Sequence, residues 1–236
     1  MKLKPIIVIP TYNERKNIKK MVPAIKQAAR GAHILVVDDN SPDKTAATVS
    51  KMSKRDRSIK LIRRKGKMGL GTAYVEGFRY ALDRKYDYIF EMDADFSHDP
   101  KYLPQFLELI KKNDLVIGSR YLKGVSVVNW PIRRLMLSKF ANFYARTITG
   151  LPLTDCTSGF KCFKRKVIEK INLDKIHSDG YAFQIEVHYK AWKQGFKIAE
   201  LPIIFVDRHA GSSKMSKRVM FEAAAIVWKL KTGIIK

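Results

Sequence analysis

The sequence is short of acidic residues and of cysteine. Its 236 residues include 22 Asp and Glu against 46 Lys and Arg, which gives a formal net charge of +24 at pH 7. Such an excess favours partners that carry phosphate, and both nucleic acid and anionic membranes qualify. The two cysteines, Cys156 and Cys162, are too far apart for a C-x-x-C pair and have no second pair beside them. This excludes a zinc site of that kind and favours two reduced, buried thiols.

Long apolar runs are missing as well. A membrane-spanning helix needs about 20 consecutive apolar residues, and the two best stretches, residues 135–148 and 221–230, are interrupted by charged side chains. The chain begins with the apolar run 5–9 and shows no signal sequence with a cleavage site. We therefore expect neither a transmembrane segment nor a signal peptide, so any contact with a membrane should be peripheral.

Short runs rich in Ile and Val alternate with stretches of helical spacing. The runs are residues 6–9, 34–37, 60–62, 88–92 and 115–118. Because they lack the polar alternation of a half-exposed strand, they are typical of parallel strands covered on both faces. The sequence thus predicts an α/β fold with a mostly parallel central sheet and helices on both faces. Helices over residues 131–149 and 181–194 and a strand over residues 200–206 are expected in the second half.

Polar clusters follow three of the predicted strands. They are residues 10–14 (Pro-Thr-Tyr-Asn-Glu), 38–41 (Asp-Asp-Asn-Ser) and 93–95 (Asp-Ala-Asp). The carboxyl ends of parallel strands share one edge of a sheet, and ligands bind at that edge. We therefore expect the three clusters to converge on one site.

Asp93 and Asp95 are the candidates for binding a metal. Two carboxylates spaced by one residue can both reach a hard cation, and Mg²⁺ commonly binds one or two carboxylates together with substrate phosphates. An alternative is that these residues, with Ser97 and Asp99, only cap a helix that begins after Pro100. We favour the metal because two other acidic clusters are expected at the same edge.

Asp39 is placed to accept hydrogen bonds from a base or a ribose. Asp43 is the better cap for a helix over residues 44–52, which would leave Asp39 free for a ligand. The alternative is that Asp39 is itself a cap.

Gly69 and Gly71 follow the third strand close to Lys65 and Lys67, but they have neither the spacing of a P-loop nor that of a dinucleotide fingerprint. Both motifs are therefore excluded. We expect these glycines to let the chain turn close to a ligand, ahead of a helix over residues 72–84.

Four motifs, in this order, resemble the family 2 glycosyltransferases of the GT-A fold, and more closely the dolichyl-phosphate mannose synthases. They are residues 8–14 (Val-Ile-Pro-Thr-Tyr-Asn-Glu), 36–43 (Val-Val-Asp-Asp-Asn-Ser-Pro-Asp), 92–95 (Met-Asp-Ala-Asp) and 118–121 (Gly-Ser-Arg-Tyr). The subgroup is indicated by residues 205–208 (Phe-Val-Asp-Arg) and 211–214 (Gly-Ser-Ser-Lys). The resemblance covers about residues 6–214, and the ordered set is far more specific than any single motif.

The resemblance implies a set of donor-binding residues. Those expected to bind the nucleotide sugar are Pro10, Tyr12, Glu14, Val37, Asp39, Asp93, Ala94, Asp95, Arg208 and Lys214. The metal, Mg²⁺ or Mn²⁺, is expected on Asp93, Asp95 and Ser97. Some relatives carry Gln where this chain has Ser97, so the third ligand departs from the family pattern.

On the acceptor side, the resemblance assigns the phosphate to Arg120, Arg134 and Ser138. Arg134 and Ser138 are four residues apart on a predicted helix, so they should face the same side. The alternative for each cation is an ordinary basic surface. The residues expected to act in catalysis are Asp95, Arg120 and Arg208.

We predict a single domain over residues 1–236, in which about 1–120 bind the nucleotide sugar and about 121–236 bind the acceptor and face the membrane. The expected reaction is inverting transfer of mannose from GDP-mannose to dolichyl or polyprenyl phosphate. The expected location is peripheral, on the cytoplasmic face of a membrane, either alone or with a membrane-anchoring subunit.

Two alternatives stay open at this point. The nearer one is transfer of glucose or another sugar from a UDP or GDP donor to undecaprenyl phosphate. The other is a basic nucleic-acid-binding protein, because a charge of +24 would supply affinity for a phosphate backbone. That function would leave the strand-end carboxylates unexplained, so we expect no nucleic-acid partner.

Overall fold

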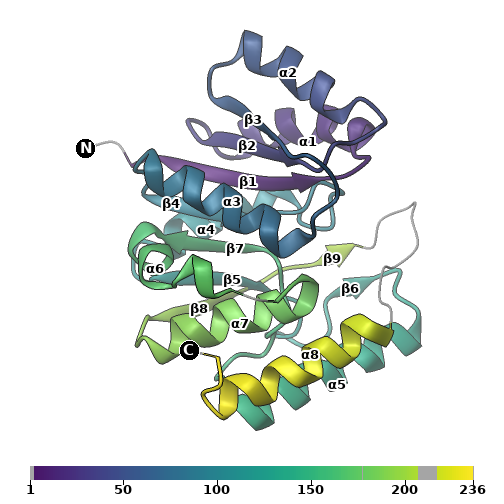
Figure 1. The fold of residues 1–236 in the computed structure, drawn as a ribbon, viewed down its shortest axis with the longest axis vertical. Coiled ribbons are helices and arrows are strands. Elements are labelled where there is room, and N and C mark those ends of the chain that lie inside the picture. The colour runs from purple at the N-terminus through teal and green to yellow at the C-terminus, as the bar shows by residue number, and fades with distance from the viewer. Residues whose placement is uncertain (1–2, 177, 207–216, 236) are drawn as a thin grey trace.

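The computed structural model describes residues 3–176, 178–206 and 217–235. A seven-stranded sheet with the order β3-β2-β1-β4-β7-β5-β8 forms its centre (Figure 1). The strands are β1 (Pro5–Thr11), β2 (His33–Asp38), β3 (Ile59–Arg63), β4 (Tyr88–Glu91), β5 (Leu115–Ser119), β7 (Lys161–Lys164) and β8 (Ile198–Pro202). Only β7 runs antiparallel to its neighbours in this sheet, so the mostly parallel α/β prediction is confirmed.

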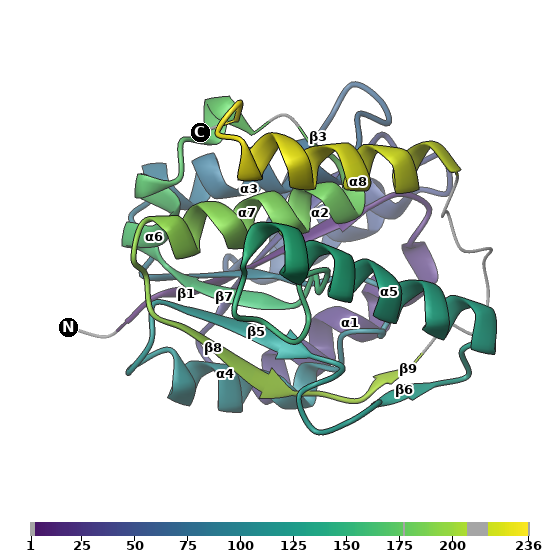
Figure 2. The same ribbon diagram turned by 90° about the horizontal axis from the view of Figure 1, so that it is seen from below.

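Helices cover both faces of the sheet. They are α1 (Arg15–Ala28), α2 (Thr45–Arg55), α3 (Leu70–Asp83), α4 (Leu103–Leu109), α5 (Ile132–Thr149), α6 (Arg165–Lys170), α7 (Gly180–Lys193) and α8 (Lys217–Lys231). Figure 2 shows α3, α7 and α8 on one side of the sheet and α1 and α4 on the other. The helices predicted over residues 131–149 and 181–194 correspond to α5 and α7.

Two apolar cores, one on each face, explain the sequence of the strands. In β1, Ile6 and Val8 pack in the core under α3 and α7, whereas Ile7 and Ile9 pack in the core with α1 and α4. Successive side chains of a strand point to opposite faces. Both faces are buried, so every position must be apolar, and the alternation of a half-exposed strand is lost.

The second half departs from prediction in several places. The strand expected over residues 200–206 is two strands, β8 and β9 (Phe205–Val206). β8 ends at Pro202, which has no N–H to continue a ladder, and β9 pairs with β6 (Val127–Val128) in a separate two-stranded sheet. Strand β7 was not predicted, although it lies between β4 and β5.

Helices α5 and α8 lie side by side at the β8 end of the molecule (Figures 1 and 2). The Tyr144 hydroxyl of α5 donates a hydrogen bond to the Ala224 carbonyl of α8 at 3.4 Å. Among the residues that the structure describes, no helix is both long enough and apolar enough to cross a membrane.

Candidate active site

The ends of β2, β1 and β4, three adjacent strands, bring the predicted polar clusters to one edge of the sheet. Thr11 is in register with Asp38, and the Thr11 hydroxyl donates to Asp38 at 2.9 Å. Asp38 also accepts hydrogen bonds from the Ser41 N–H at 3.0 Å and the Ser41 hydroxyl at 2.6 Å. Asp38 therefore fixes the turn after β2.

Asp39 is not free, contrary to the expectation from its sequence position. Its Oδ1 lies 3.0 Å from the Nε of Arg64, a guanidinium that is itself buried. Its Oδ2 accepts the Met68 N–H at 3.2 Å. The Arg64 N–H does not point at Oδ1, so within the described residues this oxygen forms an ion pair but no hydrogen bond. Burial raises the pKa of Asp39, while Arg64 and the Met68 N–H lower it.

The capping role of Asp43 is confirmed. Its Oδ1 accepts the Thr45 N–H at 3.0 Å at the start of α2. Of the residues in the capping alternative, Asp99 caps the next helix by accepting the Lys101 N–H at 2.9 Å, whereas Asp95 accepts the Ser97 N–H.

The glycines at the start of α3 make room for a carboxylate of the second half of the chain. The Gly71 N–H donates to Asp179 Oδ1 at 2.6 Å. A Cβ at Gly69 would lie 2.5 Å from Asp179 Oδ2, and one at Gly71 would lie 2.7 Å from the Ser178 carbonyl oxygen. The Arg64 guanidinium donates hydrogen bonds to the Gly69 carbonyl and to the Thr72 hydroxyl in the same turn.

Asp93 and Asp95 follow β4 at the same edge. Asp93 accepts a hydrogen bond from the Tyr74 hydroxyl at 3.3 Å. Asp95 accepts the Ser97 N–H at 3.1 Å and the Ser97 hydroxyl at 2.6 Å. Ser97 thus contacts the Asp95 carboxylate, while its own place as a third metal ligand stays a prediction.

The oxygen atoms at this edge of the sheet suit a hard cation that binds together with a diphosphate. Within the described ranges, no group of three or more His, Cys, Asp or Glu side chains could hold a metal by itself. Two carboxylates and a hydroxyl form an incomplete cage of oxygen atoms, which Mg²⁺ and similar ions complete with water and substrate phosphate. The residues present therefore fit such an ion, and Asp93 and Asp95 as its protein ligands stay a prediction.

His98 is a residue of this site that the sequence did not single out. Its Nδ1 accepts the Asp93 N–H at 3.0 Å, so in the neutral ring the proton is on Nε2. The ring stacks on Phe160 with centroids 4.9 Å apart. Burial lowers the pKa of His98, more than Asp93 and Asp95 raise it. The only sequence signal was its place directly after Ser97.

The remaining residues predicted to bind the nucleotide sugar differ in their contacts. Tyr12 carries the Lys67 ammonium 4.8 Å from its ring centroid, and Glu14 accepts a hydrogen bond from Asn17 at 2.7 Å. Pro10 and Ala94 lie at the ends of β1 and β4. Val37 is fully buried in the core under α3, because the alternation of β2 turns its side chain inward, and its role in binding the nucleotide stays a prediction. Arg208 and Lys214 lie outside the described residues.

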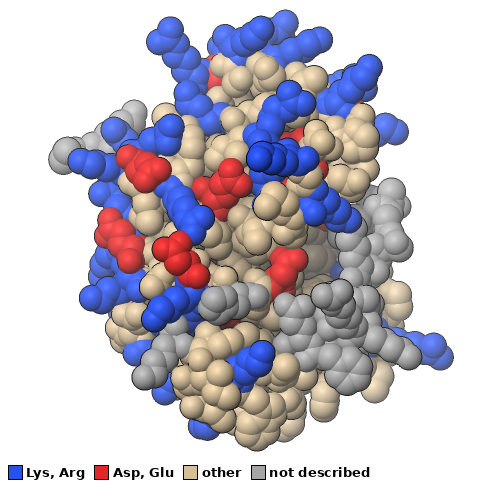
Figure 3. Space-filling model, in the orientation of Figure 1, with Lys and Arg blue, Asp and Glu red and all other residues tan. Residues whose placement is uncertain are grey.

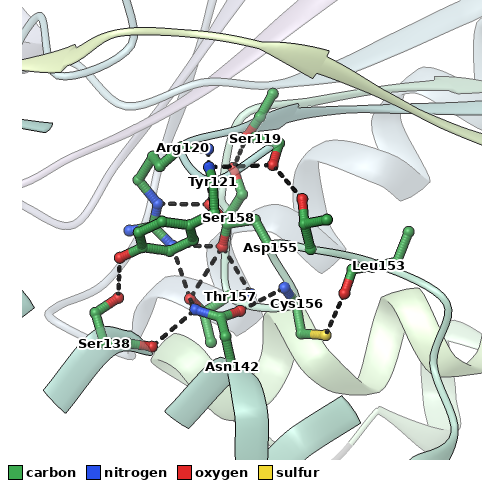
Figure 4. Close-up of polar contacts among 12 residues, drawn as sticks. Ser119, Arg120, Tyr121, Ser138, Asn142, Leu153, Asp155, Cys156, Thr157 and Ser158 are labelled. Carbon is green, nitrogen blue, oxygen red and sulfur yellow. Dashed lines mark hydrogen bonds and ion pairs between the residues drawn. The ribbon is translucent and has the colours of Figure 1, made fainter. Parts of the chain in front are cut away.

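On the acceptor side, Arg120 is held by a buried ion pair (Figure 4). Its Nε and Nη2 donate to the two carboxylate oxygens of Asp155, both at 2.6 Å, and Nη2 also donates to Thr157 at 2.7 Å. The side chains of Arg120 and Asp155 are 5% and 0% exposed. Nη1 takes part in none of these bonds. The role of Arg120 in phosphate binding or catalysis stays a prediction, and any such contact falls to Nη1.

Arg134 and Ser138 lie one turn apart on α5. The Arg134 guanidinium lies 4.1 Å from the centroid of the Trp130 ring. The Ser138 hydroxyl accepts a hydrogen bond from the Tyr121 hydroxyl at 2.8 Å (Figure 4). Ser138 is thereby linked to the segment that carries Arg120.

Solved structures share this architecture. Glucosyl-3-phosphoglycerate synthase of Mycobacterium tuberculosis, in complex with Mn²⁺, uridine diphosphate and phosphoglyceric acid, matches with a TM-score of 0.71 over 98% of this chain and 79% of that chain. The same enzyme with Mn²⁺, uridine diphosphate and glucosyl-3-phosphoglycerate gives a TM-score of 0.70. The identities are 15% and 16%, so the likeness concerns the fold. Fold and strand-end site define a glycosyltransferase of the GT-A class.

Sequence comparison gives the family. The pattern described as glycosyl transferase family 2 matches residues 6–172. The chain is 44% identical to polyprenol monophosphomannose synthase of Mycolicibacterium smegmatis over 93% of this chain and 85% of that protein. It is 41% identical to undecaprenyl-phosphate mannosyltransferase of Micrococcus luteus over 95% of this chain and 93% of that protein. The chain belongs to glycosyl transferase family 2, and the resemblance seen in its motifs is confirmed.

Proposed function

We propose that this protein transfers mannose from GDP-mannose to a polyprenyl or dolichyl phosphate with inversion at the anomeric carbon. The observation that carries the proposal is the identity of 41–44%, over more than nine-tenths of the chain, to enzymes named for mannose transfer to polyprenyl phosphates. The acidic pair Asp93 and Asp95 at the edge of the sheet supports it, because a nucleoside diphosphate bound with a cation needs such a pair.

The chemistry needs no protein base. A phosphate oxygen of the acceptor attacks the anomeric carbon, a C–O bond to that oxygen forms, and the C–O bond to the nucleoside diphosphate breaks with its electron pair. A phosphate monoester has a second pKa of about 6, so near neutral pH it is already deprotonated. What remains for the protein is to hold two anionic groups close together. Arg134, Arg208 and Lys214 are our proposed cations for this task, with Arg120 contributing through Nη1.

Asp93 and Asp95 would hold Mg²⁺ or Mn²⁺, and a bound cation supplies charge stabilisation for the departing diphosphate. Tyr74 and His98 keep Asp93 in place through its carboxylate and its N–H.

The outward face of α5 is our proposed contact with the membrane in which the acceptor resides. Four apolar side chains form one stripe along it: Ile132, Met136, Phe140 and Phe143, with exposed fractions of 67%, 65%, 63% and 66%. Lys139 and Arg146 flank the stripe on this face. Figure 3 shows Lys and Arg gathered over the α2 end, while the described part of the α8 end carries few charges. An apolar stripe with basic neighbours on a surface helix is the composition that lies in a bilayer interface.

The transfer reaction is tested with a panel of labelled nucleotide sugars and a short-chain polyprenyl phosphate, counting product that partitions into organic solvent. GDP-mannose with Mg²⁺ or Mn²⁺ should give product, and EDTA should abolish it. Asp95→Asn should lower kcat by about 100-fold or more, the usual cost of losing one electrostatic contact to developing charge. Asp99→Asn is the matched control, since Asp99 caps the next short helix and pairs with Lys101 at the surface. Product from UDP-glucose alone, or full activity of Asp95→Asn, would contradict the proposal.

Membrane contact is tested separately by flotation with vesicles that contain anionic lipid. Phe140→Glu should lower the bound fraction about tenfold, because it removes a partly buried aromatic side chain worth about 1.4 kcal/mol in the interface. Leu3→Glu adds the same charge at an exposed apolar position near the start of β1 and should float like the wild type. Equal binding of both variants and the wild type would refute a role for the α5 face.

A further inference from the structure

We infer that Tyr121 is a positioning residue of the acceptor-phosphate site, which orients the Ser138 hydroxyl so that its proton is donated to the phosphate. The inference rests on the proposed function and deepens it, because Tyr121 belongs to the Gly-Ser-Arg-Tyr motif without having a role assigned to it. Tyr121 follows β5, whereas Ser138 lies on α5, so the contact joins two separate parts of the acceptor half.

The direction of the hydrogen bond carries the argument. The Tyr121 Oη donates to the Ser138 Oγ at 2.8 Å. A serine hydroxyl has one proton and two lone pairs, so accepting from Tyr121 leaves its own proton for another acceptor. Within the described residues, the Ser138 Oγ makes no further hydrogen bond. A phosphate oxygen is the acceptor for which an oriented hydroxyl next to a cation is suited.

The backbone of Ser138 is held by a second set of hydrogen bonds, through Asn142. Asn142, one turn further along α5, donates to the Ser138 carbonyl at 2.9 Å and accepts the Cys156 N–H at 2.6 Å. Its amide nitrogen lies 3.4 Å from the Thr157 hydroxyl, to which Arg120 donates at 2.7 Å. The backbone at Ser138 and the guanidinium of Arg120 are thus held in one network (Figure 4).

The same network places charge beside the oriented hydroxyl. Arg134 precedes Ser138 by one turn and so lies on the same side of α5. The Tyr121 ring lies 5.4 Å from the Arg120 guanidinium, which keeps that group next to the phenol. Burial raises the pKa of Tyr121, more than Arg120 lowers it, so the phenol keeps its proton near neutral pH. Tyr121 can therefore donate near neutral pH, where a phosphate monoester is largely dianionic.

The test is a double-mutant cycle on Tyr121→Phe and Ser138→Ala, with steady-state kinetics for both substrates. Tyr121→Phe keeps the ring and removes only the hydroxyl. We expect KM for polyprenyl phosphate to rise five- to tenfold, with kcat changed less than twofold and KM for the nucleotide sugar unchanged. Ser138→Ala should raise the acceptor KM at least as much, and the double variant should match Ser138→Ala, because Tyr121 acts through Ser138.

Tyr144→Phe is the matched control. Tyr144 lies on the same helix, and in the part of the chain that the structure describes its hydroxyl bonds only the Ala224 carbonyl on α8. Its removal should leave both KM values at the wild-type level. This separates loss of the Tyr121 hydroxyl from a general effect of removing a phenol from this part of the fold.

Two results would overturn the inference: an unchanged acceptor KM in Tyr121→Phe, or effects of the two single variants that multiply in the double variant. If Tyr121→Phe does not fold, as judged by thermal unfolding, the comparison of Ser138→Ala with Ser138→Thr decides, and equal acceptor KM values overturn it. A wild type that forms no lipid-linked product would refute the proposed function instead, which is a distinct outcome.

Discussion

Replacing Asp155 with Asn tests whether the Arg120–Asp155 pair is a buried structural element. The change keeps the shape of the side chain and removes its charge. The Arg120 guanidinium, now 5% exposed and bonded at 2.6 Å to each carboxylate oxygen, would remain in place without a counter-charge. The introduced amide would also turn an N–H group toward a cation that can only donate.

The expected cost follows from burial. Breaking a buried ion pair by removing one partner costs about 3–5 kcal/mol, because the other charge is left uncompensated. Domains of 150–250 residues lose about 2–4 °C in Tm per kcal/mol, which converts this cost into a drop of roughly 6–20 °C. Since whole domains are stable by only about 5–15 kcal/mol, the variant should be close to the limit of folding.

The assay is urea unfolding followed by circular dichroism, together with thermal unfolding. Asp174→Asn is the control, because Asp174 also pairs with an arginine, Arg79, but the side chains are 81% and 55% exposed. An exposed pair contributes at most about 1 kcal/mol. A loss below about 1 kcal/mol in Asp155→Asn, or equal losses in both variants, would refute the assignment of a buried structural role.

Two further predictions concern the fit of Gly71 and the burial of the thiols. Gly71→Ala should lower the free energy of unfolding in urea by about 1–3 kcal/mol, because its Cβ would meet the Ser178 carbonyl at 2.7 Å. Gly66→Ala is the control. No atom lies within 4 Å of its Cβ, so its free energy of unfolding should stay within about 0.5 kcal/mol of the wild type. Burial raises the pKa of Cys156 to about 12 and that of Cys162 well above its ordinary range. Since only the thiolate reacts, neither cysteine should react with a disulfide reagent at pH 8 unless the protein is unfolded, and rapid reaction of the native protein would contradict their burial.

The parts of the fold that the sequence predicts are those in which local pattern and burial agree. Strands β1, β2, β4 and β5 consist mostly of apolar residues because both faces of the sheet are covered. Helix α5 was predicted over nearly its whole length from its spacing. In each of these cases a residue's surroundings can be inferred from its neighbours in sequence.

Strand β7 shows why the rest could not be predicted. Its sequence, Lys-Cys-Phe-Lys, begins with a charged residue that would ordinarily be placed at the surface. Lys161 is nevertheless fully buried, with its ammonium 3.3 Å from Glu91 and in contact with Gln184. A buried charge is tolerated only with such partners, and here they come from β4 and α7, which are distant in sequence.

The site was predictable to a similar extent. Asp93, Asp95 and Asp39 were expected at the sheet edge because each follows an apolar run that predicts a parallel strand. The partner of Asp39 was not expected, because Arg64 is one of 46 cations and nothing local marks it as buried. The contact of Asp179 with Gly71 spans 108 positions and was likewise beyond local pattern.

The charge distribution argues for a cation at this edge on physical grounds. The protein has a formal charge of +24, yet Asp93 and Asp95 lie where a diphosphate is proposed to bind. Like unit charges 4 Å apart repel by about 4 kcal/mol at an effective dielectric constant of 20, so these acids would weaken diphosphate binding if no cation lay between. Divalent metal should therefore increase the affinity of the wild type for GDP far more than that of Asp95→Asn. Equal enhancement in both, measured by isothermal titration, would mean that the acids at the edge serve some purpose other than holding the ion.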